Sequence, residues 1–172
     1  MERADFVQEP LRTTDEFAAV SSVADALLAH LVEAEIAALI VTANQPGQSS
    51  ANVQGVFLEH ARQLGFRDES KGLFSEYASG LRPDYFMNIG DTGIILEVER
   101  GKTTINNMDL LDFWKCHICA HADYLFLLVP MELRQNETMT ARREFVSVRR
   151  RLATFFEPQN YTNVRGLFLF GY

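Results

Sequence analysis

The sequence predicts an α/β protein whose mixed β-sheet of about four to five strands is flanked by helices. Three observations lead to this prediction. Apolar residues recur at helical spacing through most of the first 64 residues. Two extended runs then flank a Gly90-Asp91 pair, which is typical of a two-residue hairpin turn. A nearly continuous apolar run over 123–130 indicates a strand that is covered on both faces.

The first 48 residues are predicted to form a helical segment. Thr13 and Thr14 offer N-caps before an Ala- and Leu-rich run, which predicts a helix over 15–35. Residues 36–42 either continue this helix or form a strand, because their pattern fits both. The amphipathic helix packs either into the core, which is the favoured prediction, or against a second copy of the chain in a homodimer.

The rest of the chain is expected to alternate between helices and strands. A helix over 51–64 follows the break at Pro46-Gly47. A three-strand meander, a helix, a strand, a helix and a last strand come next, over 73–78, 84–89, 92–99, 107–121, 123–130, 137–156 and 164–170. We therefore expect a single domain over 1–172, with a core over 49–130 and a C-terminal helix and strand over 131–172.

The composition is that of an ordinary folded domain. The chain has 172 residues, of which 47% are hydrophobic and 23% charged, and two cysteines are too few for a disulfide scaffold. The sequence does not begin with a secretory signal, and no apolar run approaches the roughly 20 residues of a membrane span. We therefore expect a cytoplasmic protein with no membrane partner.

The net charge of −7 argues at first sight against a nucleic-acid partner, because phosphate repels an acidic protein. All of this excess lies in residues 1–60, which hold nine acidic and two basic side chains. The remainder of the chain holds 14 of each sign. The acidic first third is therefore expected to lie away from any phosphate path.

The predicted hairpin brings carboxylates together. If Gly90-Asp91 is the turn, the numbers of paired residues sum to 181, so Asp84 lies opposite Glu97. Glu99 shares the face of Glu97, because side chains alternate along a strand. Like charges placed opposite each other destabilise a sheet, so raised pKa values, an arginine or a cation must offset them. The alternative is that these carboxylates face solvent and are neutralised by nearby basic side chains.

These residues resemble a known family. Arg82-Pro83-Asp84, followed by Glu97-Val98-Glu99, is similar to the motif of the PD-(D/E)xK, or restriction-endonuclease-like, nuclease superfamily. In that superfamily a helix with a glutamate precedes the meander, the aspartate lies on the second core strand and the tripeptide on the third. A helix and a fourth strand follow. The resemblance covers about residues 50–130, and Glu99 stands where the family usually has lysine.

The resemblance implies a divalent-metal site for magnesium or manganese. Asp84 and Glu97 would be ligands, with the backbone carbonyl of Val98 and the side chain of Glu59 as further candidates. Glu99 would orient or deprotonate the attacking water, and Lys102 or Arg100 would stabilise the phosphoryl charge. Lys115 is an alternative catalytic cation.

Basic side chains in the second half of the chain are the candidates for binding nucleic acid, with DNA as the expected substrate. Thirteen of the 16 basic residues are arginine, which pairs bidentately with phosphate. A solvated helix face explains part of this pattern equally well. The candidates are Arg82, Arg100, Lys115, Arg142, Arg143, Arg149 and Arg150.

The function predicted from the sequence is metal-dependent phosphodiester hydrolysis by an endonuclease-like enzyme. Two alternatives remain open. A catalytically degenerate member would act as a nucleic-acid-binding or protein-assembly module, and an unrelated α/β interaction protein would carry its carboxylates on the surface. A zinc site in the 116–121 segment, Cys-His-Ile-Cys-Ala-His, is disfavoured, because consecutive residues on a helix diverge by about 100° and cannot all face one ion.

Overall fold

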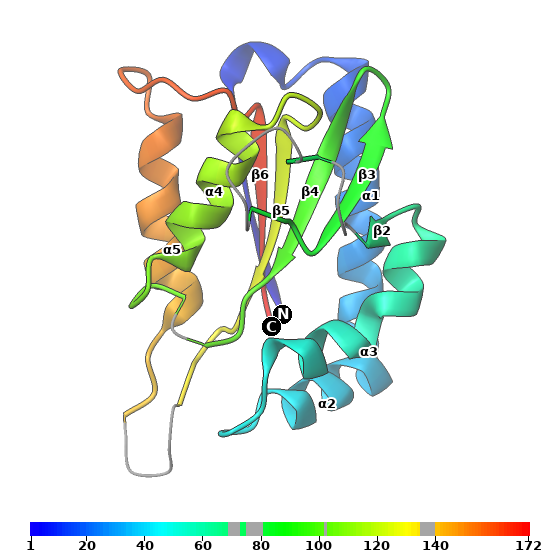
Figure 1. Cartoon of the computed structure of the whole chain (residues 1–172), viewed down its shortest axis with the longest axis vertical. Helices are drawn as coiled ribbons and strands as arrows, with labels where there is room; N and C mark the ends of the chain where they lie inside the picture. The colour runs from blue at the N-terminus through cyan, green and yellow to red at the C-terminus, as the bar shows by residue number, and fades with distance from the viewer. Residues whose placement is uncertain (69–72, 75–80, 102, 135–139) are drawn as a thin grey trace.

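A six-stranded mixed sheet forms the centre of the molecule (Figure 1). The computed structural model describes residues 1–68, 73–74, 81–101, 103–134 and 140–172. The strand order is β1-β6-β5-β4-β3-β2. The strands are β1 (Glu2–Val7), β2 (Arg67–Asp68), β3 (Tyr85–Ile89), β4 (Thr92–Val98), β5 (Tyr124–Val129) and β6 (Gly166–Gly171). β4, β5 and β6 run parallel, and the two edges of the sheet are antiparallel.

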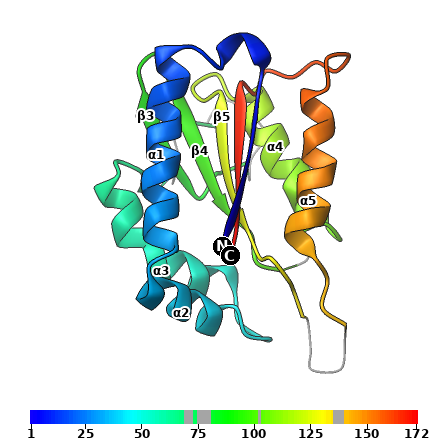
Figure 2. The same cartoon turned by 180° about the vertical axis from the view of Figure 1, so that it is seen from behind.

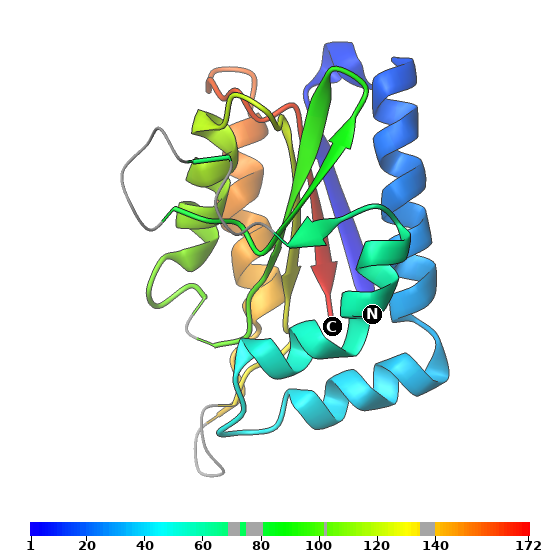
Figure 3. The same ribbon diagram turned by 45° about the vertical axis from the view of Figure 1, so that its right-hand side comes forward.

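Helices cover both faces of the sheet. One face carries α1 (Asp15–Leu31), α2 (Ala34–Ala43) and α3 (Ser50–Gln63), as Figure 2 shows from that side. The other face carries α4 (Met108–Ile118) and α5 (Glu144–Ala153), and the three layers are seen edge-on in Figure 3. Short 3-10 helices, η1 (Glu9–Leu11) and η2 (Thr154–Phe156), lie after β1 and after α5.

The sheet separates two apolar cores, and the alternation of side chains along β4 decides which residues enter each. Ile94, Leu96 and Val98 pack with α1 and α3. Ile95 packs with α4 and α5 instead. Glu97 therefore points to the α4 side, because successive side chains of a strand project from opposite faces.

The predicted hairpin is confirmed residue by residue. Ile89 pairs with Thr92, and the register continues to Tyr85 opposite Leu96. Gly90 has a φ of 56°, a conformation that glycine adopts without steric cost and that a two-residue turn requires.

The predicted α/β class with a mixed sheet and flanking helices is also confirmed, but the expected strand count of four to five was too low. The first segment is not purely helical, because residues 2–7 form β1, which pairs with β6 at the far end of the chain. Local periodicity does not reveal a pairing between residues 2 and 171. Residues 36–42 proved helical, within α2.

Two further predictions of element bounds need correction. In the described residues the helix expected over 137–156 begins only at Glu144, and Arg142, just before it, pairs with Leu133 in an isolated β-bridge. Residues 137–139 lie outside the described residues. The strand expected over 73–78 falls mostly outside the described residues, and the described strand of that region is β2.

No single helix in the described part of the chain is long and apolar enough to cross a membrane. α1 and α2 pass that test of length and composition only as a pair, and they are bent by 79° relative to each other. Val20, Ala24, Leu27 and Leu31 of α1 are buried against the sheet, which accounts for the apolar character of that helix.

Candidate active site

Asp84 and Glu97 meet at the open end of the β3–β4 hairpin. The backbone N–H of Asp84 donates a hydrogen bond to Glu97 Oε2 at 3.1 Å. The backbone N–H of Val98 donates to Asp84 Oδ2 at 2.8 Å. The structure therefore brings together the two carboxylates that the hairpin register placed opposite each other.

Lys115 enters this site from α4. Its Nζ lies 2.8 Å from Glu97 Oε1 and 2.9 Å from Asp112 Oδ1. Asp112 and Lys115 share one face of the helix, because residues three apart are neighbours on a helix surface. All three side chains are buried, with Asp112 fully so. An ammonium group thus lies beside the tripeptide even though Glu99 stands in the lysine position.

Glu99 follows directly on β4, and its backbone is held on both sides. Its N–H donates to the carbonyl of Leu128 at 2.9 Å, and its carbonyl accepts a hydrogen bond from the Tyr172 hydroxyl at 2.8 Å. Burial raises the pKa of Glu99 to about 8, with further contributions from the charges of Asp112 and Asp84.

Together Asp84, Glu97, Glu99, Asp112 and Lys115 form what we call the carboxylate site. In the described part of the site, four carboxyl groups interact with the ammonium group of Lys115, of which Glu97 and Asp112 contact it directly. Burial is the largest cause of the raised pKa at each acid, and it brings that of Asp112 to about 6. Burial lowers the pKa of Lys115, but the charges of Glu97 and Asp112 outweigh this and raise it overall. Above the raised pKa values of the acids, the described residues of the site therefore carry more negative than positive charge.

Gln54 of α3 is a member of the site that the sequence prediction missed. Its side chain hydrogen-bonds Asp84 and so lowers the pKa of that carboxyl, against the raising effect of burial. Glu59, the candidate predicted on the same helix, has an exposed side chain. Five residues at about 100° each place Glu59 roughly 140° around the helix from Gln54.

The donor set of the carboxylate site suits a hard cation. Asp112 Oδ2 is buried and has no hydrogen-bond partner. Among the described residues, however, no group of three or more acidic, histidine or cysteine side chains is arranged to hold a metal ion. Magnesium commonly takes one or two carboxylates, with waters and substrate phosphates completing its shell. Asp84, Glu97 and the carbonyl of Val98 match that smaller set in chemistry.

The cations predicted to contact nucleic acid lie in different places. Arg100 is buried, and its guanidinium donates to the backbone carbonyls of Asn44, Gln45 and Gln48, so it ties the end of β4 to the α2–α3 loop. Lys102 lies outside the described residues. Arg82 is exposed.

The C-terminal arginines lie on and before α5. Arg142 donates to Thr104 Oγ1 at 2.8 Å and lies 3.7 Å from the buried Glu144. Arg149 makes a long contact of 3.8 Å with Glu2. Arg143 and Arg150 are exposed. The contacts of Arg142 and Arg149 are thus with residues outside the carboxylate site.

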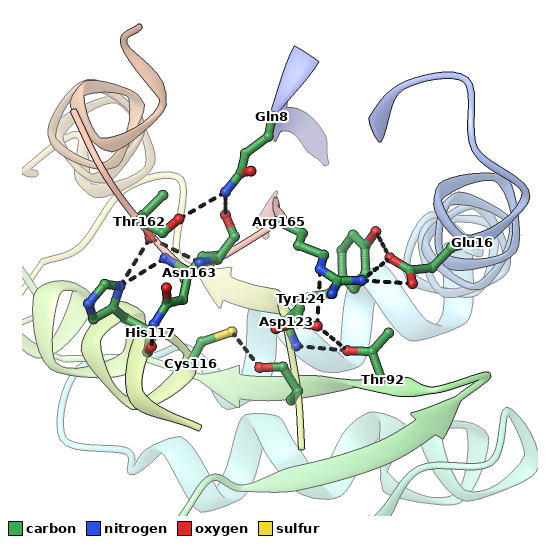
Figure 4. Close-up of polar contacts among 12 residues, drawn as sticks. Gln8, Glu16, Thr92, Cys116, His117, Asp123, Tyr124, Thr162, Asn163 and Arg165 are labelled. Atoms are coloured by element: carbon green, nitrogen blue, oxygen red, sulfur yellow. Dashed lines mark hydrogen bonds and ion pairs between the residues drawn. The ribbon is translucent and has the colours of Figure 1, made fainter. Parts of the chain in front are cut away.

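The residues of the Cys-His segment have separate partners. Cys116 Sγ donates weakly to the carbonyl of Ala122 at 3.7 Å. His117 Nδ1 accepts from the backbone N–H of Asn163 at 3.1 Å and lies 3.3 Å from the Thr162 hydroxyl (Figure 4). His121 is exposed. In the part of the chain that the structure describes, these side chains do not form a metal cluster.

No protein-family model matches the sequence, and no curated protein or solved structure is significantly similar to the chain.

Proposed function

We propose that the chain is a divalent-metal-dependent nuclease that hydrolyses phosphodiester bonds of nucleic acid, with DNA as its substrate. The observation that carries the proposal is the position of Lys115, whose Nζ lies 2.8 Å from Glu97 Oε1 inside an otherwise acidic, buried site. The site thereby combines opposed carboxylates, a carboxyl with a pKa near 8 and an ammonium group.

The order of elements supports the restriction-endonuclease-like core. α3 precedes the antiparallel meander β2–β3–β4, and α4 leads to β5, which is parallel to β4. Asp84 lies directly before the second strand of this unit, and Glu97 lies on the third. This is the order that the resemblance implies, with β1, β6, α1, α2 and α5 as additions around it.

Asp84, Glu97 and the carbonyl of Val98 would hold the magnesium or manganese ion. Such an ion, when bound, adds positive charge at the scissile phosphate and makes a water molecule more acidic. The excess of carboxylates over cations at the site favours its binding.

Glu99 and Lys115 have complementary roles in the proposal. A general base works best with a pKa close to the working pH, and the pKa of Glu99 is about 8. Glu99 therefore takes the proton of the attacking water. Lys115 remains an ammonium group, because its pKa is raised, and it stabilises the negative charge that develops on the phosphoryl oxygens.

A degenerate nuclease-fold protein that binds nucleic acid or a protein partner is the second candidate. This candidate is favoured by the hydrogen bonds and the ion pair that the residues of the site make with one another. Glu97 pairs with Lys115, and Asp84 accepts from Val98 N–H and from Gln54. A site whose groups already bind each other must exchange some of these bonds to accept a metal.

Nicking of supercoiled plasmid in magnesium or manganese tests the proposal. Wild type, Glu97→Gln and Glu16→Gln should be compared, since Glu16 lies on α1 outside the carboxylate site. The proposal predicts cleavage by wild type and Glu16→Gln, and none by Glu97→Gln. Absence of cleavage of plasmid, single-stranded DNA and RNA by wild type would instead favour the degenerate protein.

A further inference from the structure

The outer side of α4 forms one wall of an open groove of about 680 Å³. Asp112 and Lys115 face the carboxylate site, and the groove residues of α4 lie on the opposite side of the same helix. The groove continues to η2 and to the segment after it. It is lined by Asn106, Asn107, Leu110, Leu111, Phe113, Trp114, His117, Phe155 and Tyr161.

Aromatic side chains dominate this groove. Phe113 and Phe155 stack with ring centroids 4.3 Å apart. Trp114 is 46% exposed and Tyr161 is 82% exposed, although both are large rings that usually bury much of their surface. Leu111 and Ile105 are also exposed in this region. Open aromatic faces of this kind are the platforms on which unpaired bases stack.

Among the described residues that line the groove there is no acidic side chain, although the chain as a whole has a net charge of −7. The polar lining of the groove includes two asparagine amides and the His117 imidazole, besides the Tyr161 hydroxyl and the Trp114 indole N–H, and such groups can meet the donors and acceptors of a base edge. Arg151 donates to Asn107 Oδ1 at 2.6 Å and so places its guanidinium at the rim, where it also donates to the Thr104 carbonyl and lies 3.4 Å from the buried Asp109. A neighbouring smaller cavity shares Phe155 and Tyr161 but contains Glu9 and Glu157, so phosphate is disfavoured on that side of the groove.

Hydrogen bonds fix several groove residues in place. Asn163 donates to His117 through both its backbone N–H and its side-chain amide. The Tyr161 hydroxyl donates to Asn163 Oδ1 at 2.6 Å. Asn107 is held by Arg151 in a left-handed conformation, with a φ of 57°. A preorganised surface loses less conformational entropy when a ligand binds.

We propose that this groove binds unpaired bases of single-stranded nucleic acid, with the indole of Trp114 as the stacking platform. The choice of nucleic acid as the ligand rests on the proposed function. The inference extends that function, because α4 carries both the groove residues and Lys115. Binding itself needs no metal, so it can be measured independently of cleavage.

The test uses the fluorescence of Trp114, which is the only tryptophan in the chain. Oligothymidylate is titrated into the protein in EDTA, with inorganic polyphosphate and a duplex of equal length as comparison ligands. Saturable quenching by the single strand is expected, with weak or no quenching by the other two. Equal quenching by polyphosphate would overturn the proposal, because it would show attraction of charge without stacking.

Variants separate stacking from general binding. With fluorescently labelled oligothymidylate, anisotropy should show that Trp114→Ala raises the Kd about ten-fold or more. Tyr161→Ala should also raise it. Leu39→Ala removes a comparably exposed apolar side chain on α2 and should leave the Kd unchanged. An unchanged Kd in Trp114→Ala would overturn the proposal.

Two further outcomes have distinct meanings. If Trp114 emission shifts with protein concentration while the molar mass doubles, a second copy of the chain covers the groove and the proposal is wrong. Cleavage of DNA without quenching would leave the proposed function intact and overturn only the groove. Quenching without cleavage would support base binding in the groove and would contradict only the proposed nuclease activity.

Discussion

Two groups of carboxylates lie at opposite ends of β4 and β5, and they are balanced in different ways. At the carboxyl end, four acids surround Lys115 in the carboxylate site. At the amino end, Arg165 contacts both oxygens of Glu16 at 2.9 and 3.0 Å and lies 3.2 Å from Asp123 (Figure 4). We call Glu16, Thr92, Asp123, Tyr124 and Arg165 the amino-end cluster.

Hydroxyl groups complete the amino-end cluster. Tyr124 donates to Glu16 at 2.6 Å, and Thr92 donates to Asp123 at 2.8 Å. Burial raises the pKa of Glu16, but the hydrogen bonds of Tyr124 and Arg165 outweigh it and lower the pKa overall. At the carboxylate site every acid has a raised pKa instead. Paired acids at one end stabilise the fold, whereas the surplus of acids at the other end is the feature expected of a functional site.

The largest difference in stability between the two ends is expected when the cation of each, Lys115 or Arg165, is replaced. Lys115→Met leaves buried carboxylates without a partner, so the free energy of unfolding at pH 7 should fall by about 3–5 kcal/mol. Arg165→Met removes a more exposed pair and should cost about 1 kcal/mol. Urea denaturation measures both. An equal loss in the two variants would contradict the comparison.

Neutralising one acid at each end should separate activity from stability. Glu97→Gln relieves repulsion among the carboxylates while Asp112 still pairs with Lys115, so its stability should be unchanged or higher, whereas plasmid nicking should no longer be detected. Glu16→Gln weakens a favourable pair, so its stability should fall by about 1 kcal/mol with activity unchanged. Plasmid nicking and urea denaturation, performed on the same samples, check both. A destabilised Glu97→Gln would indicate a structural ion pair.

The two ends should respond to pH with opposite signs in metal-free protein. The pKa of Glu99 rises from 4.5 to about 8 on folding, so the folded state binds the extra proton and stability falls as pH rises between these values. The pKa of Glu16 is lowered from 4.5, so its contribution is present above that pH and is lost on further acidification.

Thermal unfolding across pH measures these two slopes. Glu99→Gln should flatten the slope between pH 4.5 and 8, and Glu16→Gln should flatten the acid limb. If Glu99→Gln left the slope between pH 4.5 and 8 unchanged, Glu99 would not be the group whose pKa is strongly raised on folding.

The smallest effect is expected at Gln54, which supports Asp84 without carrying charge. Gln54→Ala should raise the magnesium concentration needed for half-maximal cleavage about five-fold, since one hydrogen bond contributes about 1 kcal/mol. Gln8→Ala is the matched control, because Gln8 donates to the carbonyls of Thr162 and Val164. That variant should change stability alone, and a similar metal requirement in both would contradict a role for Gln54.

The hairpin half of the site could be predicted from the sequence, because a two-residue turn fixes the register of every residue along both strands. Asp84 and Glu97 followed from Gly90-Asp91 by counting. Asp112 was not included in the predicted site, because its position depends on how α4 crosses the sheet. The spacing of Asp112 and Lys115 was the available signal, since it places an acid and a base on one helix face.

The edges of the fold were least accessible to prediction. β1 pairs with β6, which lies at the opposite end of the chain, so no local pattern identifies its partner. Arg100 illustrates the same limit at a single residue. It follows the tripeptide and was expected to contact phosphate, yet three backbone carbonyls of the α2–α3 loop occupy its guanidinium.

Calorimetric titration with manganese tests the central claim most directly. Wild type, Asp84→Ala and Glu16→Ala should be titrated under identical conditions. The account predicts saturable heats for wild type and Glu16→Ala, and only unsaturable dilution heats for Asp84→Ala. Equal, unsaturable heats in all three proteins would contradict a metal site at the carboxyl end of β4.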